Sequence, residues 1–261
     1  MGGDCVANLY ENTAFLYDRD PRIPFSMDIP FYVKQAEKAK GPVLELACGT
    51  GRVLLPLAQQ GFQVWGIDLS EAMLTELERK KNGLPVDVQQ RIHVSRQSMC
   101  DFSIRQQFSL IFAAFRSFQA LSTEDEALSC LKTCYRHLHV GGRLLINVFR
   151  LSKPMGDWWQ SKEEKLDFET MLPGGEIMTR HSFNKSFDPI LRLLEVDLIY
   201  RIQHKEKPVK EHRDKLRLRY YEGDDLRTLL RDAGFTIEAE YGGYAGQPID
   251  QGNELLFICH K

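Results

Sequence analysis

A ten-residue segment, Val43 to Arg52, constrains the fold of this chain more than any other feature. It reads Val-Leu-Glu-Leu-Ala-Cys-Gly-Thr-Gly-Arg, so a short apolar run leads into a Gly-x-Gly turn. Apolar residues then recur over 53–58 at helical spacing, which predicts a helix directly after the turn. A glycine turn lets a ligand approach the backbone, because a Cβ atom would block it. The N-terminus of the following helix adds unpaired N–H groups. We therefore expect a strand–turn–helix unit that binds a ligand.

Predicted strands and helices alternate over the first 150 residues. The expected strands are 43–47, 62–67, 88–94, 109–115 and 143–149, and the expected helices between them are 52–60, 70–82 and 122–138. The run 109–115 is almost wholly apolar, as a strand buried on both faces should be. This alternation is typical of an α/β fold with a doubly wound parallel sheet.

An acidic residue follows the second predicted strand. Asp68 lies about 20 residues after the glycine turn, the spacing at which a carboxylate binds the two ribose hydroxyls of a nucleoside. A carboxylate suits this role because it accepts two hydrogen bonds side by side. We expect Leu69 and Met73 to supply apolar contact for the adenine, and Asp101 to accept a hydrogen bond from the adenine amino group.

The turn differs from the one that binds dinucleotides. Leu54 stands where the third glycine of the dinucleotide fingerprint is expected. Glu45, inside the first strand, would add negative charge beside a phosphate group. Both features disfavour a nicotinamide dehydrogenase, and they indicate a nucleoside whose third substituent is not a polyphosphate.

Together these segments resemble the motifs of the class I S-adenosylmethionine-dependent methyltransferases. Residues 45–52 resemble the family's first motif, Asp68-Leu69-Ser70 with Met73-Leu74 its second, and Cys100-Asp101-Phe102 its adenine-contacting motif. The resemblance covers residues 25–150 well. It implies a seven-stranded, Rossmann-like methyltransferase sheet whose last strand is antiparallel. It also implies S-adenosylmethionine as the cofactor, above the carboxyl ends of the first strands.

The resemblance also implies roles for individual residues. Glu45, Ala47, Gly49 and Gly51 would surround the methionine part of the cofactor, and Phe115 would lie close to the sulfonium. The Tyr17-Asp18 and Phe31-Tyr32 pairs resemble the lid that covers the cofactor in this group. The expected cofactor-binding residues are therefore Tyr17, Tyr32, Glu45, Ala47, Gly49, Gly51, Asp68, Leu69, Met73, Cys100, Asp101 and Phe115.

The sequence pattern changes after residue 150. Four predicted strands, 165–171, 176–183, 190–201 and 210–221, are joined by turns, which indicates an inserted antiparallel sheet. A helix over 224–233 and strands over 235–241 and 254–259 complete the main sheet. We expect an N-terminal lid and helix in 1–40, the latter from Ser26, a cofactor-binding core in 41–150, and the insertion in 151–221. Residues 222–261 return to the core. The insertion would cover the substrate or form a homodimer.

The methyl acceptor is less well defined by the sequence. Residues 112–118 lack the Asn/Asp-Pro-Pro-Tyr/Phe signature of enzymes that methylate DNA adenine or a glutamine amide. We expect in-line transfer to a nitrogen or oxygen of a small molecule, with Arg116 and Tyr220 near the acceptor. His181, His204, His212 and Tyr220 are candidate bases, and the catalytic residue stays open. Two alternatives remain: a methyltransferase acting on RNA or protein, and a non-catalytic cofactor-binding protein.

Charge and cysteine use bear on partners and location. The formal net charge is -2, which gives no electrostatic reason to expect nucleic acid as a partner. No apolar run suits a membrane helix, no secretory signal precedes the first predicted elements, and six scattered cysteines indicate reduced thiols, so we expect a cytoplasmic protein. Cys130, Cys134 and His137 share a helical face, but Leu131 on the same helix indicates core packing and we expect no metal.

Overall fold

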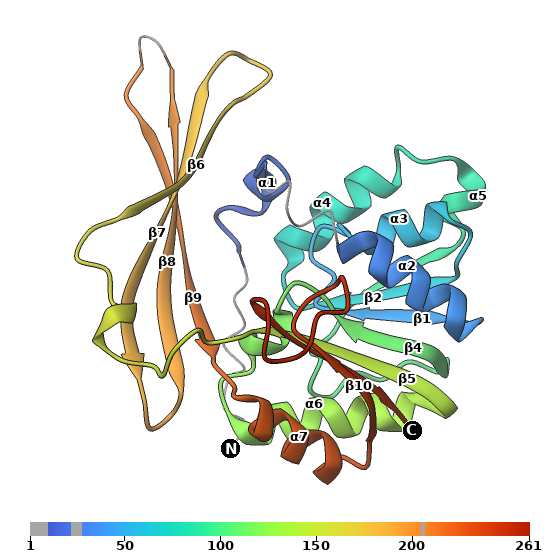
Figure 1. The fold of residues 1–261 in the computed structure, drawn as a ribbon. Helices are drawn as coiled ribbons and strands as arrows, with labels where there is room; N and C mark the ends of the chain where they lie inside the picture. Colours follow the sequence, from blue (N-terminus) through green and yellow to red (C-terminus); the bar gives the residue numbers. More distant parts are fainter. Residues whose placement is uncertain (1–9, 22–27, 205–206) are drawn as a thin grey trace.

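The computed structural model describes residues 10–21, 28–204 and 207–261. It contains a seven-stranded sheet flanked by helices and, beside it, a separate four-stranded sheet (Figure 1). We call these sheet A and sheet B. The α/β class, the doubly wound main sheet and the second antiparallel sheet are confirmed.

Sheet A has the strand order β10-β11-β5-β4-β1-β2-β3. Strands β1 to β5 run parallel, whereas β11 is antiparallel to both β5 and β10. The chain builds outward from β1 to β3 and then returns to place β4 on the other side of β1. In such sheets ligands bind at the carboxyl ends of the strands, where the order reverses. The strands are β1 (Val43–Leu46), β2 (Val64–Asp68), β3 (Ile92–Arg96), β4 (Phe108–Ala113), β5 (Leu138–Phe149), β10 (Thr236–Tyr241) and β11 (Glu254–His260).

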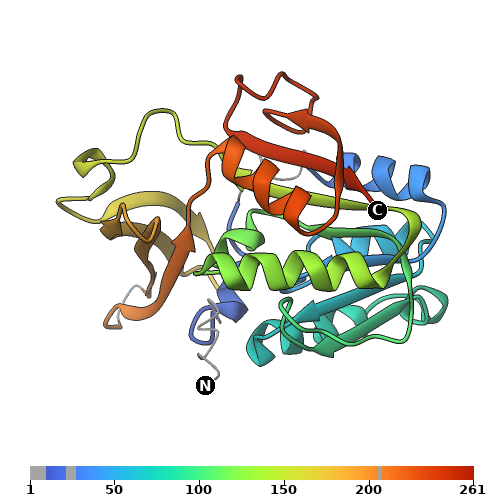
Figure 2. The same cartoon turned by 90° about the horizontal axis from the view of Figure 1, so that it is seen from below.

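Helices cover both faces of sheet A. One face carries α2 (Asp28–Ala39), α3 (Leu54–Gln59) and α4 (Glu71–Lys81), with the short α5 (Val86–Gln89) beside them. The other face carries α6 (Glu124–His137) and α7 (Gly223–Asp232), which lie next to each other in the view from below (Figure 2). Strands β1 and β4 are buried along their whole length, since helices cover them on both sides. The start of α6 is fixed by a capping box between Thr123 and Glu126.

Sheet B lies between β5 and α7 in the chain. Its strands, in the order β6-β7-β8-β9, are β6 (Lys165–Met171), β7 (Ile177–Asp188), β8 (Leu193–Gln203) and β9 (Lys210–Arg219), and every neighbouring pair is antiparallel. Alternate residues of β8 point to opposite faces. Val196, Leu198 and Tyr200 form an apolar inner face with Leu216 of β9.

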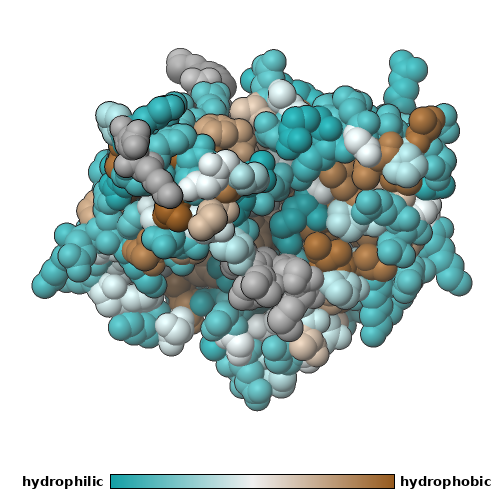
Figure 3. Space-filling view, turned by 90° about the horizontal axis from the view of Figure 1, so that it is seen from above, coloured by the Kyte–Doolittle hydropathy of each residue, from teal (hydrophilic) through white to brown (hydrophobic). Residues whose placement is uncertain are grey.

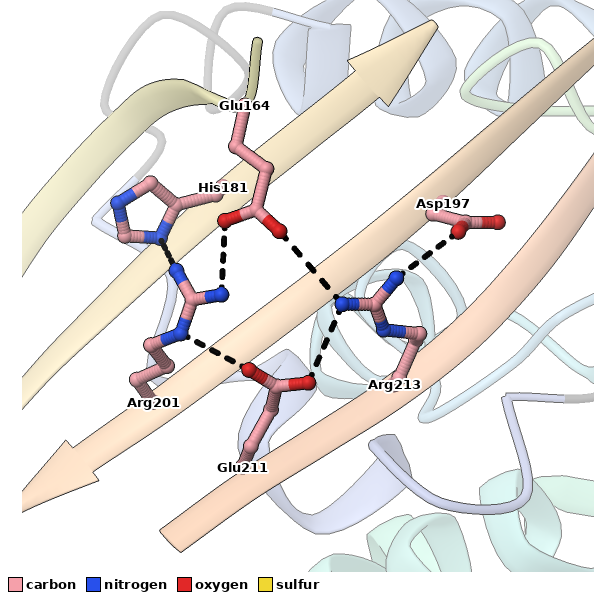
Figure 4. Close-up of polar contacts among 6 residues, drawn as sticks. All are labelled: Glu164, His181, Asp197, Arg201, Glu211 and Arg213. Carbon is pink, nitrogen blue, oxygen red and sulfur yellow. Dashed lines mark hydrogen bonds and ion pairs between the residues drawn. The ribbon is translucent and has the colours of Figure 1, made fainter. Parts of the chain in front are cut away.

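The outer face of sheet B carries a network of ion pairs (Figure 4). Arg201 binds Glu164 and Glu211 at 2.7 and 2.9 Å, and Arg213 binds Glu211 at 3.2 Å and Asp197 at 3.1 Å. Hydrogen bonds from the two arginines lower the pKa of Glu211, against the opposing effect of partial burial. This face is therefore charged and directed away from the apolar core of the sheet.

Residues 10–21, which we call the strap, make contacts both with sheet B and with segments that flank sheet A. The strap contains α1 (Ala14–Tyr17), which lies between sheet B and α4 (Figure 1). Towards sheet B, Thr13 Oγ1 donates a hydrogen bond to Asp214 at 2.5 Å, and Leu16 packs in the inner-face cluster. Towards sheet A, Thr50 Oγ1 and Lys80 Nζ both donate to the carboxylate of Asp18 at 2.7 Å.

Most expected elements lie within a few residues of their predicted bounds, but β5 begins at Leu138 rather than at 143, β7 ends at Asp188 rather than at 183, and β3 starts late. The strand expected over 88–94 begins only at Ile92, because Pro85 precedes a single helical turn, α5. The run expected over 210–221 ends as a strand at Arg219. Ser26, the expected helix start, lies outside the described residues. Among the described helices, none has the length and apolar character to cross a bilayer.

Candidate active site

A cavity of about 680 Å³ lies between the carboxyl ends of the sheet A strands and the inner face of sheet B. Seen from above, the surface is hollowed near its centre, and apolar side chains are visible inside a hydrophilic rim (Figure 3). The strap contributes Tyr10, Tyr17, Asp20 and Pro21 to the cavity lining. The cavity therefore occupies the edge at which α/β sheets of this kind bind ligands.

The glycine turn forms the wall of the cavity at the end of β1. Ala47, Gly49 and Gly51 have left-handed backbone angles, with φ of 50°, 54° and 80°. A Cβ atom on Gly49 would meet nothing within 4 Å, so this backbone faces open space at the cavity. A Cβ on Gly51 would instead lie 3.0 Å from Leu55 and Leu77. The absence of a Cβ atom at Gly49 thus leaves space for a ligand, and its absence at Gly51 leaves space for the core side chains of Leu55 and Leu77.

Asp68 links the glycine turn to the next helix. Its Oδ2 accepts a hydrogen bond from Gly49 N and its Oδ1 one from Ser70 N, both at 2.8 Å. Burial raises the pKa of the Asp68 carboxyl, and these backbone hydrogen bonds partly offset the rise. Each carboxylate oxygen keeps a second lone pair. Because Asp68 also borders the cavity, it can accept hydrogen bonds from two ligand hydroxyls as well.

Behind the turn lie two charged residues, the buried Glu45 and the partly buried Arg52. Arg52 makes a bidentate ion pair with Asp28, at 2.8 and 2.5 Å, and its guanidinium lies 4.9 Å from the centroid of the Phe115 ring. Burial raises the pKa of Glu45, and the charge of Arg52 opposes that rise. Glu45 Oε2 is buried and accepts no hydrogen bond from the described residues. This acceptor lies behind the turn and outside the cavity lining, so its charge rather than a direct contact would favour a ligand with an amino group, as the methionine part of S-adenosylmethionine has.

Two strained residues follow β4 at the cavity. Phe115 and Arg116 have φ of 54° and 65°, values that cost energy for residues with a side chain. Asn147 holds this backbone in place by accepting a hydrogen bond from Arg116 N at 2.9 Å. The Arg116 guanidinium pairs with Glu254 on β11 at 2.5 Å. Phe115 and Arg116 are thereby fixed as part of the cavity wall.

The cavity brings together eight of the residues expected at the site. They come from the strap, from the ends of three neighbouring strands and from the first turn of α4, and they are Tyr17, Ala47, Gly49, Asp68, Leu69, Met73, Phe115 and Arg116. Their assembly follows from the parallel sheet, which places the carboxyl ends of β1, β2 and β4 at one edge.

Six expected residues do not border the cavity. Glu45 and Gly51 support the turn from behind, as described above. Tyr32 is fully buried in the core, where its ring stacks on Phe112 with 4.5 Å between centroids. Tyr220 is buried just beyond β9. Cys100 and Asp101 follow the lining residue Met99, and the Cys100 carbonyl accepts a hydrogen bond from Thr133 at 2.8 Å.

Most other lining residues were not expected from the sequence. Gln97 and Met99 border the cavity beyond β3, next to the expected Cys100 and Asp101. Tyr10, Trp159 and Arg180 reach it from segments far away in the chain. Along the strands of sheet B, residues that face the cavity alternate with residues that face solvent. This alternation identifies two faces, but the sequence does not show which of them faces sheet A.

None of the candidate histidine bases borders the cavity. His181 lies on the outer face of sheet B, 3.5 Å from Arg201 (Figure 4). His204 pairs with Glu176 at 3.5 Å, and the His212 ring packs against Phe15. Cys130 and Cys134 lie on the buried face of α6, and the described residues contain no group of three side chains suited to a metal ion.

Comparison with known proteins shows what this chain is similar to. A family model described as a methyltransferase domain matches residues 43–142, which span β1 to the first part of β5. The "Putative methyltransferase YqeM" of Bacillus subtilis (strain 168) is 34% identical over 118 residues, 45% of this chain and 46% of that protein. The chain thus matches about half the length of this relative.

Two further comparisons extend over most of the chain. The dTDP-3-amino-3,6-dideoxy-alpha-D-glucopyranose N,N-dimethyltransferase of Streptomyces fradiae is 23% identical over 228 residues, 86% of this chain and 82% of that protein. The crystal structure of an S-adenosylmethionine-dependent methyltransferase from Clostridium acetobutylicum ATCC 824 has a TM-score of 0.77 at 20% identity, covering 97% of this chain and 99% of that chain. Residues 43–142 therefore match a methyltransferase domain, and the chain as a whole has the fold of an S-adenosylmethionine-dependent methyltransferase structure.

Proposed function

We propose that this protein transfers a methyl group from S-adenosylmethionine to a nitrogen or oxygen of a small molecule. One observation carries the proposal: a single cavity extends from Gly49 and Asp68 to the inner face of sheet B. One end offers the features expected of a cofactor site, and the other end leaves room for an acceptor. A volume of about 680 Å³ lies within the range of roughly 300–1,000 Å³ that is typical of small-molecule sites.

The residues of the chain would bind and orient the two reactants. Asp68 would accept hydrogen bonds from the ribose hydroxyls, and Leu69 and Met73 would contact the adenine. The backbone of Ala47 and Gly49, with Glu45 behind it, would surround the methionine part. When bound, S-adenosylmethionine supplies a methyl group already activated by the positive sulfonium. The protein then has to align the acceptor with that methyl group and exclude water.

The position of the cavity between the two sheets favours a small acceptor over a macromolecule. Sheet B and the strap supply lining residues opposite the ends of the sheet A strands. A protein or RNA chain would need an open surface at this place. The Streptomyces fradiae relative is named for dimethylation of a sugar amine, which supports a small molecule here as well.

The experiment supplies methyl-labelled S-adenosylmethionine together with three kinds of acceptor. These are a mixture of small amines and alcohols, bulk RNA, and denatured casein. We expect label to enter the small-molecule fraction, with release of an equal amount of S-adenosylhomocysteine. Label in RNA or casein would contradict the proposal. Cofactor binding without transfer to any acceptor would point to a non-catalytic binding protein and would contradict the proposal too.

A further inference from the structure

Among the described residues, three charged side chains line the cavity wall formed by the strap and sheet B. Arg180 of β7 binds Asp20 of the strap at 2.9 Å, and its Nε lies 3.5 Å from Asp167 of β6. All three residues border the cavity. Two carboxylates therefore share one guanidinium, and this wall has an excess of negative charge.

The other cation of the cavity has a carboxylate partner as well. Arg116 pairs with Glu254, which also accepts a hydrogen bond from Asn147. Among the described lining residues there is no lysine and no histidine. With Asp68 reserved for the cofactor, the described lining of the acceptor part has two arginines, Arg116 and Arg180, and two carboxylates, Asp20 and Asp167, while Glu254 pairs with Arg116 from outside the lining. Each arginine is already paired.

Apolar and aromatic side chains form most of the rest of the acceptor wall, together with the uncharged polar residues Ser117, Gln119, Ser182 and Asn184. Trp159 and Phe149 stack with 6.3 Å between their centroids and an interplanar angle of 16°. Phe168 of β6 lies next to Asp167, and the remaining lining of sheet B consists mainly of valine and leucine side chains from β8 and β9. Such a wall suits an uncharged apolar or ring-shaped body, and aromatic faces also attract cations.

We propose that the acceptor is an amine carried on an apolar, phosphate-free body, and that Asp167 accepts a hydrogen bond from its nitrogen. This inference rests on the proposed function and names the substrate class of the same site. Asp167 is the better placed of the two acids. Its side chain is 23% exposed and Asp20 only 3%, where Arg180 holds it. Ser182 Oγ donates to Asp167 Oδ1 at 2.9 Å and fixes the carboxylate.

The charge distribution matches the course of the reaction. The bound ammonium first releases a proton to water, which frees a lone pair on the nitrogen. That lone pair forms the bond to the methyl carbon while the carbon–sulfur bond breaks and its electron pair stays on sulfur. The positive charge therefore moves from sulfur to nitrogen. A fixed carboxylate beside the nitrogen stabilises the charge as it develops.

The same charges disfavour a nucleotide-linked acceptor. The Streptomyces fradiae relative is named for a dTDP-sugar, whose diphosphate carries at least two negative charges. In this chain that group would face Asp20 and Asp167, and both arginines of the lining already have carboxylate partners. The substrate class is thus expected to differ from that of the relative in lacking phosphate.

The test measures binding to protein saturated with S-adenosylhomocysteine, so it does not depend on turnover. The probes are 2-phenylethylamine, cyclohexylamine and thymidine diphosphate. We expect at least one of the amines to bind and thymidine diphosphate not to bind. Asp167→Asn keeps the shape and removes the charge, and it should weaken amine binding about tenfold, the loss expected for a hydrogen bond between charged groups.

Glu169→Gln is the matched control. Glu169 is exposed on the same strand, opposite Thr179, and its substitution should leave amine binding unchanged. Three results would overturn the inference, provided that S-adenosylhomocysteine still binds. They are binding of thymidine diphosphate, failure of both amines to bind, and unchanged amine affinity in Asp167→Asn. Loss of S-adenosylhomocysteine binding in the unaltered protein would instead overturn the proposed function, and this inference with it.

Discussion

The carboxylate of Asp68 accepts a hydrogen bond of 2.8 Å from the amide of Gly49, which lies 19 residues earlier in the chain. The end of β2 is thereby tied to the turn after β1. A second bond of 2.8 Å, from Ser70 N, ties the same carboxylate to the start of α4. Asp68 therefore shapes the site in addition to its proposed contact with the ribose.

We expect Asp68→Ala to lower the affinity for S-adenosylmethionine about 100-fold, because two charge-assisted hydrogen bonds to the ribose would be lost. The unfolding free energy should fall by about 1–3 kcal/mol, since the amides of Gly49 and Ser70 lose their partner. Titration calorimetry and urea unfolding measure the two effects. Ser70→Ala is the control: it removes the helix cap, which costs about 1 kcal/mol, and should leave the affinity unchanged. Unchanged affinity in Asp68→Ala would refute the ribose contact.

The two glycines of the turn should respond differently to alanine. Gly49→Ala places a methyl group in open space at the cavity, so cofactor affinity should fall strongly, and the left-handed backbone costs about 1–2 kcal/mol of stability. Gly51→Ala carries the same backbone cost and adds crowding against Leu55 and Leu77 at 3.0 Å. It should lose about 1–3 kcal/mol more. Thermal unfolding and calorimetry of both variants test this order, and equal stability losses would contradict it.

Much of the fold follows from local sequence pattern. Alternating strands and helices predict a parallel sheet, and the position of an acid relative to the glycine turn predicts that Asp68 and Gly49 belong to one site. The alternation is a local signal, and the spacing between the turn and the acid is informative because the topology of a parallel sheet is known. The helix at 86–89 escaped prediction because four residues are too few to show a period, and Val88 is buried in either structure.

The acceptor side of the cavity could not be predicted in the same way. Asp20 and Arg180 are separated by 160 residues, and their pairing depends on how sheet B lies against the strap. Tyr32 was expected at the site but lies in the core. An aromatic residue on a helix suits a pocket or a core equally well, and its neighbour Phe112, on a distant strand, decides in favour of the core.

The position of the strap should depend on Asp18. Thr50 and Lys80, on the sheet A side of the cavity, both donate hydrogen bonds to its carboxylate. We expect Asp18→Ala to accelerate amide hydrogen exchange in α1 and to weaken S-adenosylmethionine binding about fivefold, equivalent to about 1 kcal/mol. Lys81→Ala, whose partner Glu78 lies on the same helix, serves as the control and should change neither quantity. Unaltered exchange in Asp18→Ala would show that these bonds do not hold the strap.

The ion pairs on the outer face of sheet B should make a small, pH-dependent contribution to stability. The pKa of Glu211 is lowered in the folded protein, partial burial opposing the hydrogen bonds from Arg201 and Arg213. A lowered pKa stabilises the fold above the unfolded value of about 4.3. That contribution is lost as the pH falls through the folded pKa.

Glu211→Gln should therefore lower the unfolding free energy at pH 7 by up to about 1 kcal/mol, a modest effect because the pair is largely exposed to solvent. The difference from the unaltered protein should shrink as the pH falls below 4. Urea unfolding at both pH values measures it, and a difference that grows in acid would contradict the assignment. Thr179→Ser, on the same face of β7, is a neutral control.

The most direct test of the central claim is a pair of calorimetric titrations of the full chain, one with S-adenosylmethionine and one with NAD. A site built from the Gly49 turn and Asp68, with Leu54 in place of a third glycine, should bind S-adenosylmethionine saturably at one site per chain and give no heat with NAD. No binding of S-adenosylmethionine, or equally tight binding of NAD, would contradict the account.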